Sequence, residues 1–110
     1  MRSNKEIELF IDTAFSAYAA AAQRAANRRD DGTCNFDVAV LYIKHGSAKA
    51  VEMLKRIGLP AYLRKRGVVV VSTPFGGQAQ KRTSAGEAIY ETFDQAQIPG
   101  VVADIEYQMD

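Results

Sequence analysis

The chain has 110 residues, of which 47% are hydrophobic and 25% charged, with ordinary glycine and proline counts. This composition excludes a disordered, collagen-like or low-complexity protein and is sufficient for one hydrophobic core. The single cysteine excludes a disulfide framework and a zinc site built on paired cysteines, and the single histidine excludes a His-rich metal site. No apolar run is long enough to cross a bilayer, and the first residues contain no apolar signal core. We therefore expect a single cytoplasmic domain over residues 1–110.

The net charge of +1 hides a polarity along the chain. Residues 32–83 carry nine basic and two acidic groups, whereas residues 84–110 carry six acidic groups and no Lys or Arg. A protein that coats nucleic acid gains affinity from many phosphate contacts, for which a near-neutral chain with an acidic last quarter is poorly suited. We expect the two charged blocks to fold against each other and mostly to face water.

The first segment is predicted to be an amphipathic helix within residues 1–31. Ser3 and Glu6 have the spacing of a capping box, and Asp30-Asp31-Gly32 breaks the pattern. The second half of the segment is rich in alanine, so another element can approach it closely. The apolar positions at helical spacing are Ile7, Phe10, Ile11, Ala14, Phe15, Tyr18, Ala21, Ala22 and Ala25.

Four later segments have the pattern of strands. Residues 36–43 and 68–73 are nearly all apolar, which is typical of strands buried on both faces. Residues 61–65 and 101–108 alternate and carry charge, which is typical of strands at the edge of a sheet. Gly67 predicts a tight turn between the second and third of these strands.

Two helices separate the strands. Ser47 is the expected N-cap of the first, which Gly58 ends. Ser84 and Glu87 form a second capping box, which predicts that the other helix begins at Ser84 after a polar loop and stops at Pro99. The expected inward faces are Val51, Leu54 and Ile57 in the first helix and Ala85, Ala88, Ile89, Phe93 and Ala96 in the second.

The order of these elements is a helix followed by β-α-β-β-α-β. We therefore predict an α+β protein in which residues 32–110 form a ferredoxin-like split βαβ core with a four-stranded antiparallel sheet. The first and third strands are then central. Because the two core helices cover one sheet face only, we expect the N-terminal helix to cover the other face. A second subunit in a homodimer is the alternative cover.

This topology brings three polar segments to one end of the sheet, where they predict a cleft that binds a phosphate-bearing or other anionic ligand, such as a nucleotide or a nucleic-acid end. The helix N-terminus offers backbone N–H groups, Lys81 and Arg82 add charge, and Asn35 and Gln108 add polar selection. Alternatively, Arg82 has only a structural role: it pairs with Asp37 or Asp110 and holds the C-terminus in place. The candidate ligand-binding residues are Asn35, Asp37, Gln78, Lys81, Arg82, Thr83, Ser84, Tyr107, Gln108 and Asp110.

Two other functions compete with ligand binding. A basic patch at the opposite end, formed by Lys44, Arg64, Lys65 and Arg66, suits contact with a host protein, although such a hairpin is often only a solvated turn. A small hydrolase that uses Asp37 or Asp110, with or without a metal, is the other alternative. No histidine is placed to act as a base for Cys34, so we expect a buried thiol there. No catalytic residue, cofactor or metal site is expected.

The same polar segments resemble a family of small proteins encoded in bacteriophages and other mobile elements. The resemblance rests on Gly32-Thr33-Cys34-Asn35-Phe36-Asp37, on Gly77-Gln78 with Lys81-Arg82-Thr83 and Ala85-Gly86-Glu87-Ala88, and on Tyr107-Gln108-Met109-Asp110. The family pattern has Gly-Gln-Gly followed by two basic residues and Thr, from which this chain departs at Ala79 and Gln80. The resemblance implies an accessory role exerted by binding, which in phage proteins includes inhibition of host defence systems.

Overall fold

The computed structural model contains seven elements, in the predicted order. It describes residues 3–26, 35–74 and 79–109, except for the side chains of residues 35–37, 79–84 and 107–109. Its helices and strands are α1 (Asn4–Ala26), β1 (Asn35–Ile43), α2 (Ser47–Ile57), β2 (Ala61–Lys65), β3 (Val68–Val71), α3 (Ala79–Ala96) and β4 (Val101–Met109).

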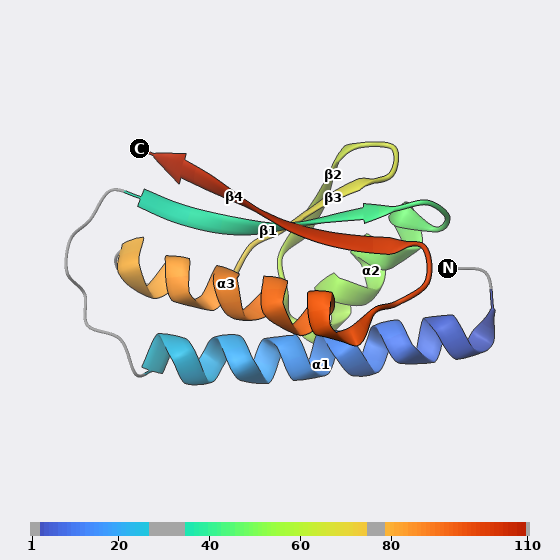
Figure 1. The fold of residues 1–110 in the computed structure, drawn as a ribbon, viewed down its shortest axis with the longest axis horizontal. Coiled ribbons are helices and arrows are strands. Elements are labelled where there is room, and N and C mark those ends of the chain that lie inside the picture. The colour runs from blue at the N-terminus through green and yellow to red at the C-terminus, as the bar shows by residue number, and fades with distance from the viewer. Residues whose placement is uncertain (1–2, 27–34, 75–78, 110) are drawn as a thin grey trace.

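The strands form one antiparallel sheet in the order β2-β3-β1-β4 (Figure 1). The two apolar strands are central and the two charged strands lie at the edges, as predicted. In the register of the sheet, Ala39 of β1 lies between Val71 of β3 and Ile105 of β4. Strand β3 ends at Val71, two residues earlier than expected, and the Ser72 N–H donates to the Pro60 carbonyl at 2.7 Å.

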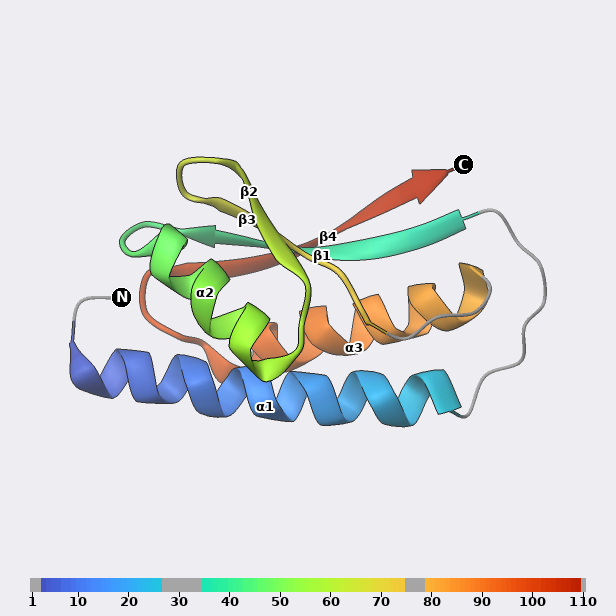
Figure 2. The ribbon, with the colours of Figure 1, turned by 180° about the vertical axis from the view of Figure 1, so that it is seen from behind.

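The helices form two layers on one side of the sheet. Helices α2 and α3 pack against the strands, and α1 packs on α3 and α2 without covering the sheet (Figures 1 and 2). The prediction that the N-terminal helix covers the second sheet face is therefore wrong. The alanine-rich stripe of α1 explains the difference, because a helix surface of small side chains allows the close approach of another helix, here α3.

The inward stripe of α1 also differs in part from the prediction. Ser3 caps the helix, since the Glu6 N–H donates to the Ser3 Oγ at 3.1 Å. Phe15, expected inside, is 58% exposed. Phe10 does face the core, where its ring lies 5.3 Å from that of Phe93 of α3, centroid to centroid. The buried residues of α1 are Phe10, Thr13, Ala14, Ala17, Ala21 and Ala25.

Helix α2 is capped by a glycine at each end. Gly46, in the left-handed region at φ 86°, is its N-cap, and Ser47 makes no cap hydrogen bond. Instead the buried Ser47 Oγ accepts a bond of 3.2 Å from the N–H of Gly67, so it fixes the β2–β3 turn. Gly58 ends the helix as predicted, at φ 110°, with its N–H directed to the Leu54 and Lys55 carbonyls.

Helix α3 begins at Ala79, five residues before the predicted N-cap Ser84. Ala79, Gln80, Lys81 and Arg82 all have high helix propensity, so the helix extends through them. It ends at Ala96, before Pro99, because Gln97 adopts a left-handed conformation at φ 51°. The inward positions Ala85, Ala88, Ile89 and Phe93 are buried, as predicted, and join the core between the helices and the sheet.

Candidate functional site

The predicted ligand site lies at the end of the sheet where β1 begins and β4 ends. Asn35 is paired in register with Met109, and Asp37 with Tyr107, so two of the three polar segments are neighbours along the backbone. The first turn of α3 lies at this same end of the sheet (Figures 1 and 2). The backbone positions of Asn35, Asp37, Lys81, Arg82, Thr83, Ser84, Tyr107 and Gln108 therefore belong to this end; their side chains, and Gln78 and Asp110 altogether, lie outside the described residues.

The early start of α3 changes the chemistry expected there. Lys81 and Arg82 now lie near the start of the helix, whose first turn holds no acidic residue. The N-terminus of a helix carries a partial positive charge, so acidic residues are favoured in the first turn and basic residues are not. The backbone N–H groups of this first turn and two basic residues in the sequence beside it are features that suit an anion.

An ion pair that the sequence did not predict joins the basic hairpin, residues 64–66, to strand β4. Arg64 lies at an irregularity in the β2–β3 register, and its guanidinium donates to both carboxylate oxygens of Glu106 at 2.7 and 2.5 Å. The hydrogen bond from Arg64 lowers the pKa of Glu106, and the same bond raises the pKa of Arg64. Arg64 is therefore engaged within the chain, whereas Lys44, Lys65 and Arg66 are exposed.

This ion pair crosses the sheet face opposite to the one on which α1, α2 and α3 lie (Figures 1 and 2). Arg64 is on one edge strand and Glu106 on the other, so the pair spans β3 and β1. The face has an apolar centre of four valines that are 0–6% exposed: Val38, Val40, Val68 and Val70. By register, three exposed apolar side chains lie on the same face, Tyr42, Tyr62 and Val102. We call this surface, from Val38 to Val102, the open face.

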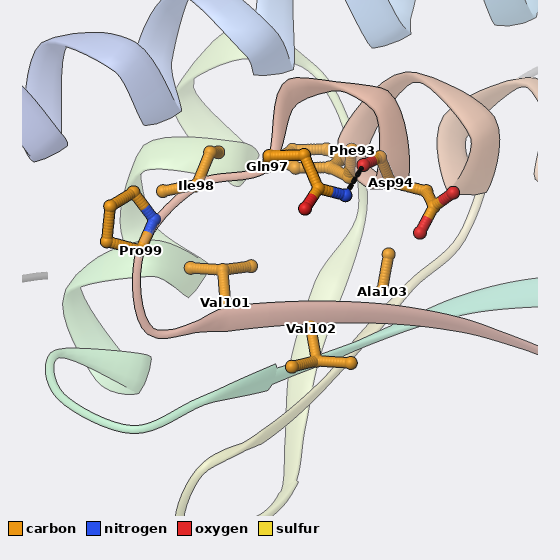
Figure 3. A pocket seen from close by; sticks show the side chains of 8 residues that line it. All are labelled: Phe93, Asp94, Gln97, Ile98, Pro99, Val101, Val102 and Ala103. Carbon is orange, nitrogen blue, oxygen red and sulfur yellow. Dashed lines mark hydrogen bonds between the residues drawn. The ribbon is translucent and has the colours of Figure 1, made fainter.

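Three hollows are lined by side chains that the structure describes. One, of about 310 Å³, lies between the end of α3 and the start of β4, where Asp94 is the single titratable side chain (Figure 3). Gln97 is oriented back along the helix, and its Nε2 donates to the Asp94 carbonyl at 2.6 Å. Another hollow lies along α1 and α3 beside Asp12 and Thr92.

The third hollow belongs to the open face. It measures about 320 Å³ and lies between Tyr42, Gly67, Gly100 and Val102, where β1 ends and β4 begins. Its lining is mostly apolar, and Lys44 is its only charged residue. Sequence reasoning missed the open face because it assigned the N-terminal helix to it. The signal in the sequence was that β1 and β3 are apolar on both faces, which indicates that the face opposite the helices is also buried.

Comparison with known proteins identifies no relative. No family model, curated protein or solved structure matches this chain. The resemblance to phage and mobile-element proteins therefore stays a prediction. Among the side chains that the structure describes, no group of three from His, Cys, Asp or Glu is placed to hold a metal ion. In the same part of the chain, none of the helices combines the length and apolarity of a membrane span.

Proposed function

We propose that this chain is a non-enzymatic binding protein with a ferredoxin-like core that holds an anionic ligand at the strand end described above. The split βαβ element order and the two central strands β1 and β3 support the fold assignment. The ligand is a small molecule that bears phosphate, or a nucleic-acid end, because these groups match a helix N-terminus flanked by cations.

One observation carries the ligand-binding proposal: Lys81 and Arg82 lie near the N-terminus of α3, at the sheet end where polar positions of β1 and β4 are paired. Cations at this position oppose the helix dipole and reduce the stability of the helix. A bound anion removes that unfavourable interaction. The arrangement is therefore better suited to ligand binding than to stability alone.

The test compares two variants that each remove one positive charge. Titration calorimetry with pyrophosphate and with ATP measures the affinity of the wild type, of Arg82→Ala and of Arg56→Ala, an exposed cation on α2. Loss of a charge-assisted hydrogen bond costs about 1.5–3 kcal/mol, so Arg82→Ala should raise the Kd by about ten- to a hundredfold. Arg56→Ala should change the Kd by less than about twofold, because surface charges at a distance are screened by salt.

Native mass spectrometry of the freshly purified protein complements the titration, since it reports any small molecule that co-purifies. An adduct of nucleotide mass that disappears in Arg82→Ala would support the proposal. Equal weakening by both variants would indicate only general attraction of anions. Loss of binding on Lys65→Ala, with Arg82→Ala unaffected, would move the site to the basic hairpin and contradict the proposal.

A further inference from the structure

We propose that the open face packs against the open face of a second copy of this chain, about a two-fold axis parallel to the strands. This inference is independent of the ligand site, which lies at the end of the sheet. It rests on the apolar centre of the open face, on the charges at its two edges and on the symmetry that those charges select.

The apolar part of the open face is larger than its valine centre. Tyr42 is 40% exposed, Tyr62 51% and Val102 64%, and all three lie around the buried valines. Contiguous exposed apolar side chains with a polar rim mark interaction sites on soluble proteins. The hollow between Tyr42 and Val102 adds a concave region that a partner's side chain can fill.

The two edges of the open face carry opposite charge. Arg64 and Lys65 lie on β2, and Lys65 is paired in register with Val68 of the valine centre. Asp104 and Glu106 lie on β4, paired with Val40 and Val38. A surface that is positive at one edge, apolar in the middle and negative at the other is complementary to a rotated copy of itself.

The charges decide between the two simple symmetry axes. When two sheets stack face to face about an axis parallel to the strands, β2 of each copy lies over β4 of the other. By register, Lys65 then lies over Val102 of the second copy, two residues along the strand from Asp104. An axis across the strands places β2 over β2, which brings like charges together. Sheets that stack face to face commonly keep their strands nearly aligned, which the first arrangement also satisfies.

The intrachain ion pair is compatible with this interface. Arg64 and Glu106 already form a bidentate pair, so covering them leaves neither charge without its partner. A single-stranded nucleic acid suits the face less well, because Asp104 on one edge repels phosphate and Arg64 on the other is already paired with Glu106. Of the central strands' described side chains on this face, only Tyr42 is aromatic and able to stack on a base.

The test measures the monomer–dimer equilibrium by sedimentation velocity over a range of concentrations. The wild type should dimerise, and Tyr62→Glu should be monomeric because a carboxylate is then placed at the edge of the apolar centre and, by register, opposite Asp104 of the second copy. The matched control is Phe15→Glu, since Phe15 is 58% exposed on α1 and lies away from the sheet. This control should dimerise like the wild type.

Charge reversal tests the symmetry itself. Lys65→Glu and Asp104→Lys should each raise the dimer Kd by about tenfold or more, because each places like charges opposite one another. The double variant should recover the affinity of the wild type. An axis across the strands instead predicts that neither single variant loses affinity, because each residue then faces the same residue of the second copy. Circular dichroism of each variant checks that the fold is retained.

Three outcomes would overturn the inference. The first is a wild type that stays monomeric at millimolar concentration. The second is a dimer that Tyr62→Glu leaves intact, which would place the interface elsewhere. The third is a monomer whose tyrosine fluorescence is quenched by oligo(dT), with the quenching lost in Tyr42→Ala, which would assign the face to single-stranded nucleic acid.

Discussion

Arg64 and Glu106 are 42 residues apart in sequence, and their contact covers the centre of a sheet that has no helix on this side. The four valines beneath them are almost completely buried in the single chain. Long polar side chains can cover apolar surface with their methylene groups while their charged ends stay in water. At the scale of single residues, one ion pair thus shields the valines of the open face from water, and a register irregularity in β2 places Arg64 over them.

The pKa of Glu106 leads to a prediction about pH. Because the Arg64 hydrogen bond lowers the pKa of Glu106 in the folded chain, the carboxylate stabilises the fold above its unfolded pKa of about 4.3. That stabilisation is lost as the pH falls through the lower, folded pKa. Glu106→Gln should therefore be less stable than the wild type at pH 7 and equally stable near pH 2, as measured by urea unfolding at several pH values.

The control for this experiment is Glu52→Gln, which removes an exposed carboxylate from α2. Its difference from the wild type should stay small throughout. A difference between Glu106→Gln and the wild type that is the same at pH 7 and at pH 2 would show that the ion pair does not contribute to stability.

At the scale of elements, the same capping motif predicted the start of one helix correctly and of another incorrectly. Ser3 and Ser84 have the same Ser-x-x-Glu spacing, yet Ser3 caps α1 and Ser84 lies inside α3. Ser3→Ala should reduce the free energy of unfolding by about 0.5–2 kcal/mol, because it removes an N-cap. Ser84→Ala should leave it unchanged or raise it by up to about 0.5 kcal/mol, because alanine has the higher helix propensity.

Thermal unfolding followed by circular dichroism measures both effects, and each variant serves as the control for the other. A loss of stability in Ser84→Ala similar to that in Ser3→Ala would mean that α3 begins at Ser84 in solution. Lys81 and Arg82 would then precede the helix instead of lying near its N-terminus. The unfavourable interaction with the helix dipole, on which the ligand-binding proposal rests, would be absent.

The sequence predicted the elements of this chain better than their boundaries. Periodicity identified all seven elements and placed β1 and β3 at the centre, because double-sided apolar strands have few other positions in a sheet. It failed for Ser84, where residues of high helix propensity before a capping box allowed the helix to extend. For the ligand site, topology predicted that the start of β1 and the end of β4 lie at one end of the sheet, whereas the Arg64–Glu106 contact depends on a local register irregularity that periodicity does not reveal.

At the scale of the whole molecule, α1 forms a third layer and leaves one sheet face to an ion pair. The sequence left two places for this helix, and its alanines decide between them. Ala14, Ala17, Ala21 and Ala25 are all buried and provide a narrow surface that fits a second helix. A sheet of valines offers no matching ridge of small side chains, whereas α3 presents Ala85 and Ala88 as part of the same core.

This layer arrangement predicts the effect of enlarging one alanine. Ala17 is fully buried in the core, whereas Ala19, two residues later on the same helix, is exposed. Ala17→Leu should reduce the free energy of unfolding by about 1–3 kcal/mol, because extra methylene groups force the packed helices apart. Ala19→Leu should change it by less than about 0.5 kcal/mol, as is usual for a surface substitution. Both variants replace an alanine by a leucine within the same helix, so the change in helix propensity is the same and by itself predicts equal effects on stability. Urea unfolding that gives equal stabilities for the two variants would therefore show that α1 does not pack through this stripe, and that the helix remains a candidate cover for the open face.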